Sequence, residues 1–237
     1  MDDVRVPADI TGTVDLSLIP TAGLGKVEIL PGAASSVYGA NAEGGVLHLF
    51  TRRLQPGARM ASAETSYSAY DTRGYSVKTG AAERGFDIFL GVSGETSDGF
   101  QQNSKADKNS ANGRVSLGLG AAGSLAVTGF YSDFETGLPS GTPVPIADWN
   151  GSRERTANSL TDWQTSKRSS IAGSWSGGGE DLALRLDSGL LSNKIDAFQS
   201  GSASGSRVAD KSLSARATAY RRAGSRSPDA PFQPGLR

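Results

Sequence analysis

The chain lacks cysteine altogether and contains a single histidine, His48, in 237 residues. The absence of cysteine excludes disulfides, thiol catalysis and cysteine-based metal sites. A single histidine excludes a multi-histidine zinc or iron site, and we expect no metal and no cofactor. Lysine plus arginine and aspartate plus glutamate each number 24. This balance removes any general attraction to nucleic acid, and we expect no nucleic-acid partner.

The chain also lacks long hydrophobic runs. No stretch approaches the ~18 consecutive apolar residues of a transmembrane helix. The N-terminus has no basic region followed by an apolar run, so it shows no signal peptide. The lack of a long apolar run does not exclude a membrane β-barrel, because barrel strands alternate apolar and polar residues and never form such a run. The missing signal indicates either a cytosolic chain or a chain whose true N-terminus is absent.

Hydrophobic residues are scarce, at 37%, whereas glycine is abundant, at 31 residues. This composition is poor material for a thick, close-packed core, and it favours thin, extended structure. The length allows one large or two small domains.

Two-residue alternation of apolar with polar or small residues dominates the chain after residue 60, and it predicts eight antiparallel strands. Several are long enough to cross a membrane at a tilt. The alternation is clearest in 86–92, 115–119 and 182–186, and weaker in 61–71, 73–81, 125–134, 166–176 and 211–220. Short turns are predicted at 82–84, 121–123 and 177–179, and long polar loops at 99–112, 137–159 and 199–209. This plan is typical of an outer-membrane barrel, although a soluble antiparallel sandwich also alternates on one face.

The first 54 residues differ from the rest. Short β-branched runs at 4–6, 27–30 and 46–50 are separated by turns rich in glycine and proline, which predicts a small mixed unit with a helical turn near 33–38. We therefore divide the chain into 1–54, a linker at 55–60, strands over 61–222 and an irregular, proline-containing tail at 223–237.

One motif discriminates among these possibilities. Residues 27–53 read VEILPGAASSVYGANAEGGVLHLFTRR, and they resemble the closing segment of the plug domain of TonB-dependent outer-membrane receptors. Segments 3–6 and 14–20 extend the resemblance, particularly to cobalamin-type members. The residues that match are Glu28, Gly32, Ser35, Tyr38, Gly39, Ala42, Gly44, Gly45, Val46, Thr51 and Arg52.

Two positions depart from the family pattern. Pro31 stands where a basic residue is usual, removes one backbone donor and is expected to end its strand. His48 stands where a small polar residue is usual, and we expect it to pack within a strand rather than to bind a ligand. Physically, Gly39, Gly44 and Gly45 permit positive φ and close backbone approach.

The resemblance implies a mainly β fold: a partial transmembrane antiparallel β-barrel with a small α+β plug segment inside it. An eight-stranded barrel has no room for a plug, so the strands are expected to be about eight of a larger barrel, in a chain truncated at both ends. The plug residues Glu28, Gly32, Tyr38, Gly39, Gly44 and Gly45 are expected to be structural.

The implied function is energy-coupled uptake of a scarce nutrient, such as cobalamin or an iron-siderophore, across the bacterial outer membrane. The implied partners are the small-molecule ligand, outer-membrane lipid, and TonB through an N-terminal box that the chain lacks. No catalytic residue is predicted, the chain is not expected to be an enzyme, and the ligand-binding residues are unassigned. A passive porin or adhesin barrel, and a soluble β-sandwich, remain alternatives.

Three weaker signals have simpler explanations. The glycine pattern at 118–123 matches a dinucleotide fingerprint, but a strand-like segment follows it where a helix is required, so we expect a hairpin turn. Acidic residues assigned to the outer loops are expected to be solvated rather than to bind calcium; they are Asp98, Asp107, Asp133 and Glu135. Trp149 and Trp163 are compatible with a membrane interface or with ordinary packing.

The alternation also predicts which face meets lipid. Large apolar residues share one parity, and charged residues take the other, where water or plug groups can solvate them. We expect Leu90, Leu117 and Leu184 to face lipid, and Asp87, Arg114 and Arg185 to face the lumen.

Overall fold

The computed structural model describes residues 14–33, 42, 44–139, 145–179, 182–200 and 205–221. These residues form two separate antiparallel sheets. The smaller is a hairpin of β1 (Leu24–Pro31) and β2 (Gly45–Thr51). The larger is an eight-stranded meander in which each strand pairs with the next along the chain. Its strands are β3 (Arg59–Ser68), β4 (Thr72–Glu83), β5 (Phe86–Ser97), β6 (Ala106–Gly118), β7 (Ser124–Gly137), β8 (Trp163–Gly178), β9 (Leu182–Phe198) and β10 (Ser206–Arg221).

All eight strands predicted after residue 60 are present, and the chain is mainly β as expected. The sheet does not close, because β3 and β10 form its two edges, which agrees with a partial barrel. Two predicted loops were too long. Ala106 to Asn112 belong to β6, and β10 begins at Ser206. Asp107 therefore lies on β6, and Asp133 and Glu135 lie on β7, rather than in loops.

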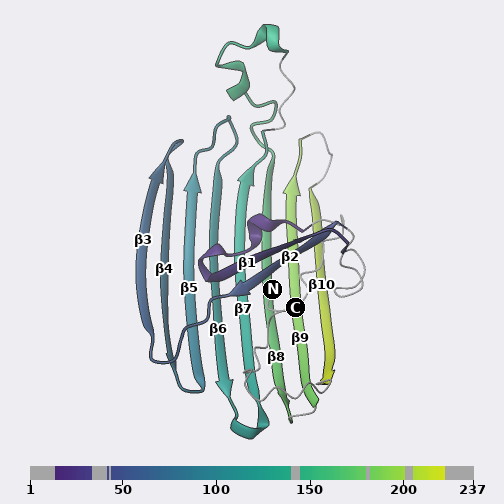
Figure 1. Ribbon diagram of the computed structural model, residues 1–237. Helices are drawn as coiled ribbons and strands as arrows, with labels where there is room; N and C mark the ends of the chain where they lie inside the picture. Colours follow the sequence, from purple (N-terminus) through teal and green to yellow (C-terminus); the bar gives the residue numbers. More distant parts are fainter. Residues whose placement is uncertain are drawn as a thin grey trace.

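From β4 onward, short and long connections alternate along the meander as predicted, whereas the connection between β3 and β4 has only residues 69–71. The turns at 84–85 and 119–123 are short, whereas the connections at 98–105 and 138–162 are long. The second long connection carries two 3-10 turns, η4 (Ile146–Asp148) and η5 (Arg153–Arg155), and projects beyond the strand ends in Figure 1. It is tied to the first one by a hydrogen bond from the Gln102 amide to the Arg155 carbonyl, at 2.8 Å.

The glycine pattern at 118–123 forms a turn between antiparallel strands, as expected. A single 3-10 turn, η3 (Gly120–Ala122), joins β6 to β7. Gly123 has φ of +95°, and a Cβ there would lie 2.0 Å from the Ser176 carbonyl oxygen. The indole Nε1 of Trp175 donates to the Ala122 carbonyl at 3.0 Å, which anchors the turn to β8.

Residues 14–24 lie against one face of the large sheet (Figure 1). Two 3-10 turns, η1 (Leu16–Leu18) and η2 (Thr21–Gly23), precede β1. We call residues 14–24 the docking segment, the sheet face that it contacts the inner face, and the opposite face the outer face. Among the described residues, no helix has the length and apolar character needed to traverse a membrane.

The strand register confirms the predicted separation of side chains between the two faces. Successive pairings place the predicted apolar residues together on the outer face, where each is at least 39% exposed: Leu90, Leu117 and Leu184. The same pairings place the charged residues together on the inner face: Asp87, Arg114 and Arg185. A face that is apolar yet exposed is the opposite of a soluble sandwich, in which the apolar faces pack together.

Candidate functional site at the inner face of the sheet

The docking segment is shaped by Asp15 and Pro20. The Asp15 carboxylate caps η1 by accepting hydrogen bonds from the Ser17 amide at 2.9 Å and the Ser17 hydroxyl at 2.6 Å. This capping fixes the first turn. It also directs the apolar residues that follow against the sheet: Leu18 is 1% exposed and Ile19 is 4% exposed. Pro20 is also fully buried, and it separates η1 from η2 because it cannot continue a hydrogen-bonded turn.

The inner face beneath this segment is unusually polar for a buried surface. Large polar side chains from β6, β8 and β9 are at most 7% exposed, together with the hydroxyls of neighbouring serines. Buried polar and charged groups are costly unless they are paired. We call these residues the polar cluster: Asn112, Arg114, Ser132, Ser166, Arg168 and Asn193.

Arg168 links the polar cluster to the docking segment. Its guanidinium Nη1 donates to the backbone carbonyl of Asp15 at 3.2 Å, and the side chain is 1% exposed. A hydrogen bond from a charged donor contributes about 1.5–3 kcal/mol. This contact therefore connects β8 to a segment that is far from it in the sequence.

At Gly23 the backbone of the docking segment lies very close to the Asn112 side chain of β6. A Cβ at this position would lie 1.7 Å from Nδ2 and 2.5 Å from Cγ of Asn112. The Asn112 side chain is buried and has little freedom to move away. Only glycine allows the backbone of η2 to lie this close to β6.

The chain that leaves the hairpin is held to the same face. The Arg52 amide donates to the Gly23 carbonyl at 2.8 Å, which closes the base of the hairpin onto η2. The Leu54 amide donates to Oδ1 of Asp87 at 3.2 Å. The other oxygen of that carboxylate, Oδ2, lies 3.7 Å from Nε of Arg114. Asp87 therefore joins the linker after β2 to the polar cluster.

The plug-motif residues that the structure describes lie on or beside the hairpin. Glu28 lies opposite His48 and forms an ion pair with Lys26. His48 packs in β2 beside Phe50, with ring centroids 4.0 Å apart, as expected of a strand residue. Among the described residues, no cluster of three or more histidine, aspartate or glutamate side chains is arranged to hold a metal ion.

The glycines of the motif behave differently from one another. Gly45 has φ of +135°, and a Cβ there would lie 2.6 Å from the Leu30 carbonyl oxygen, so both expected properties are present. Gly44 has neither: its φ is not positive, and a Cβ there would meet nothing within 4 Å. The expectation for Gly44 was therefore wrong. β1 ends at Pro31, as predicted. Tyr38, Gly39 and most of the predicted helical turn lie outside the described residues.

The motif thus lies on the hairpin, whereas the buried contacts with the large sheet come from other residues. Strand alternation placed Arg114 on the inner face, but it did not single out Arg168 or Asn112. Gly23 could not be recognised either, because its requirement arises from a contact with β6, far along the sequence. The strongest available signal was the Asp15 cap followed by Leu18 and Pro20.

Comparison with known proteins agrees with this geometry. Residues 1–46 match the family model of the TonB-dependent receptor plug domain. The vitamin B12 transporter BtuB of Photobacterium profundum is 29% identical over 157 residues, which cover 62% of this chain and 26% of the transporter. The chain thus spans about a quarter of the length of that relative.

Solved structures of siderophore receptors share the fold at low sequence identity. The pyoverdine-bound receptor FpvA of P. aeruginosa superposes with a TM-score of 0.67 at 14% identity, over 86% of this chain and 30% of that one. The ferric-catecholate import receptor Fiu of E. coli K12, in its open form, gives a TM-score of 0.64 at 16% identity, over 85% and 37% respectively. The plug-domain match over residues 1–46, the BtuB relative and the shared barrel fold together show that the chain is similar to TonB-dependent receptors.

Proposed function

We propose that this chain is part of a bacterial outer-membrane transporter that takes up a scarce nutrient, cobalamin or an iron-siderophore, with energy supplied through TonB. Residues 1–54 are the end of the plug, 55–60 are a linker, and 61–222 are barrel strands. One observation carries the proposal: a plug-like sequence at residues 1–46 precedes an open sheet, and its described part packs on the sheet's polar inner face. The chain itself performs no chemistry on the ligand.

The character of the docking contacts supports this role. A plug that must move under an applied force is held best by contacts that water can replace. The hydrogen bonds from Arg168 and Leu54 are of this kind; each involves one charged group, and such a bond contributes about 1.5–3 kcal/mol net of its exchange for water. Burial of Leu18 and Ile19 adds a small apolar contribution that keeps the plug seated at rest.

The hairpin residues Glu28, Gly32, Gly44 and Gly45, with Tyr38 and Gly39, are proposed as structural elements of the plug. The positive φ of Gly45 and the Leu30 carbonyl oxygen beside it, which leave no room for a side chain, support this role. The exposed apolar outer face of the sheet supports placement in the outer membrane. A passive porin gives no reason for a plug-like sequence ahead of the strands.

Uptake in whole cells tests the proposal. The receptor that contains this chain is expressed in a strain that lacks its own cobalamin and siderophore receptors, with and without TonB. Accumulation of labelled cyanocobalamin or of a ferric siderophore is expected only when receptor and TonB are both present. Equal accumulation without TonB would indicate a passive pore. No accumulation of either ligand class would contradict the proposed substrates.

A further inference from the structure

The outer face of β7–β10 carries a band of charge near the ends joined by the long connections. Lys167 of β8 lies directly opposite Lys194 of β9, and Asp133 of β7 lies directly opposite Lys167. Two like charges facing each other across adjacent strands are destabilising. The arrangement is therefore stabilised by any anion that approaches both lysines from outside the sheet.

The aspartates on this face neutralise only part of the positive charge. Lys167 Nζ lies 2.9 Å from Asp133, and Lys194 Nζ lies 2.9 Å from Asp196, which also pairs with Arg207 of β10. We call the following residues the basic cluster: Lys167, Lys194, Arg207 and Lys211, all on the outer face. With Glu135 of β7 counted, four cations against three carboxylates leave a formal excess of one positive charge on the outer face of β7–β10. Acidic residues on β6 and β7, Asp107 and Glu135, limit the cluster on that side.

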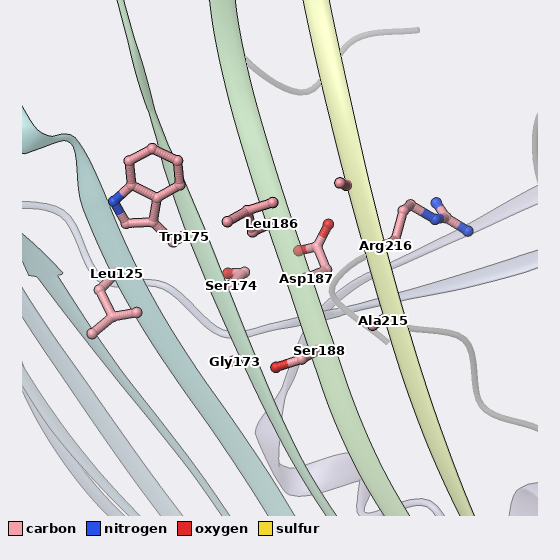
Figure 2. A pocket seen from close by; sticks show the side chains of 10 residues that line it. Leu125, Gly173, Ser174, Trp175, Leu186, Asp187, Ser188, Ala215 and Arg216 are labelled. Atoms are coloured by element: carbon pink, nitrogen blue, oxygen red, sulfur yellow. The ribbon is translucent and has the colours of Figure 1, made fainter.

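A shallow groove of about 510 Å³ lies further along the outer face, toward the short turns. Leu125, Trp175 and Leu186 form one row of large side chains across β7–β9. In the next row toward the basic cluster, the side chains at Gly173 and Ala215 are absent or small, and the groove lies over this row. Figure 2 shows Trp175 and Leu186 beside the bare backbone of Gly173. Ser188 and Ala217 of the outer face complete the lining, together with Ser174, Asp187 and Arg216, which the register assigns to the inner face.

The spacing between the two features matches one leaflet of a membrane. At ~3.3 Å per residue, Lys167 is about 20 Å from Gly173 along β8. Membrane strands tilt by about 35–45°, so the separation along the membrane normal is ~15 Å. Half of a bilayer's hydrocarbon thickness is also ~15 Å.

We propose that this outer surface binds one phosphorylated lipid, with its phosphate on the basic cluster and an acyl chain reaching the groove beside Trp175. The inference rests on the proposed function, since only a strand that crosses the membrane presents this face to lipid. Lysine ammonium groups are point-charge phosphate binders. The phosphate offsets the repulsion between Lys167 and Lys194, while the groove adds contacts that an unphosphorylated lipid shares but inorganic phosphate lacks.

The test measures lipid retention by the delipidated receptor in nonionic detergent, using native mass spectrometry. The probes are dimyristoyl phosphatidate, dimyristoylglycerol and inorganic phosphate at equal concentrations. The site variants are the double variant Lys167→Gln/Lys194→Gln and the groove-filling variant Gly173→Leu. The matched control is Lys78→Gln/Lys108→Gln, which removes two lysines from the inner face.

One phosphatidate is expected to remain on the wild-type receptor, at least tenfold more than dimyristoylglycerol. The lysine double variant and Gly173→Leu are each expected to lower phosphatidate retention about tenfold, whereas the control retains it. Equal retention of dimyristoylglycerol would reduce the site to ordinary apolar contact. Displacement of phosphatidate by equimolar phosphate would make it an inorganic anion site. Either result, or unchanged retention in the lysine variant, overturns the inference. Nutrient uptake is measured separately, so a failure of the proposed function can be distinguished from a failure of lipid binding.

Discussion

At the scale of single residues, the docking segment depends on two contacts that differ in kind. The contact of Gly23 with Asn112 is steric, because no side chain fits between η2 and β6. The contact of Arg168 with the Asp15 carbonyl is polar, at 3.2 Å in a site shielded from water. Both join residues that are far apart in the sequence, so each affects docking without belonging to the plug motif.

Gly23→Ala is expected to weaken docking, because the new methyl group would overlap Asn112. Overpacking of this kind costs about 1–3 kcal/mol. The measurement is the rate of proteolysis of the docking segment in the folded receptor, which should rise. Gly44→Ala is the control, since a Cβ there meets nothing within 4 Å. Adding Asn112→Ala should relieve the clash, and a double variant as sensitive as Gly23→Ala would contradict the steric explanation.

Arg168→Met is expected to loosen the same segment for an electrostatic reason. The substitution keeps much of the buried volume but removes the donor to the Asp15 carbonyl, a loss of about 1.5–3 kcal/mol. Hydrogen exchange of the amides of residues 15–19 should accelerate by tenfold or more. Arg216→Met, on the exposed inner face of β10, should leave that exchange unchanged. Equal acceleration in both variants would mean that overall charge, and not this contact, holds the segment.

At the scale of elements, alternation identified every strand of the large sheet but misplaced several ends. β6 begins at Ala106 and β9 continues to Phe198, beyond the regions where large apolar residues alternate. In these extensions the outer face carries Asp107 and Lys194 rather than leucine or valine. Hydrophobic alternation disappears where both faces of a strand are polar, as in the first part of β6, or where both carry apolar residues, as at Leu190 and Leu191 of β9, although backbone pairing continues. Periodicity therefore locates the apolar band rather than the whole strand.

The candidate site was less predictable than the strands for a related reason. Its two main contacts join residues that are far apart in the sequence, Arg168 with Asp15 and Asn112 with Gly23, and no local pattern encodes such pairs. Arg114 was assigned to the inner face because it interrupts a clear apolar alternation. Arg168 lies in a weaker alternation among serines, where a charged residue on either face would have looked equally plausible.

The outer face supports a prediction that depends on depth in the membrane. Leu190 lies midway between the Trp175 row and the Lys194 row, whereas Leu184 lies closer to the short-turn ends. An arginine facing lipid costs ~2–4 kcal/mol at the midplane and ~0–1 kcal/mol near the interfaces. Leu190→Arg should therefore impair assembly of the receptor in membranes more than Leu184→Arg. Ala183→Arg, on the inner face, should have little effect. Equal tolerance of all three in a membrane assembly assay would favour a soluble sandwich.

At the scale of the whole molecule, the eight-stranded sheet presents two kinds of surface that do not suit water. Its outer face exposes large side chains such as Ile171, Leu190 and Leu213. Its edge strands, β3 and β10, each pair with a neighbour on one side only among the described residues. Edge strands leave backbone N–H and C=O groups free to pair with another chain. Detergent affects the two surfaces differently. It covers the apolar outer face, but it does not supply hydrogen-bonding partners for the edge strands.

This difference gives a prediction for the 237-residue chain produced by itself. In detergent-free buffer the chain is expected to form large assemblies, since both the apolar face and the strand edges promote association. In detergent the apolar face is covered, and smaller oligomers joined through β3 and β10 should remain. Light scattering coupled to size exclusion distinguishes the two conditions. A monodisperse monomer in plain buffer would contradict the barrel assignment, because a lone chain with an exposed apolar face and two open edges has no means of staying separate.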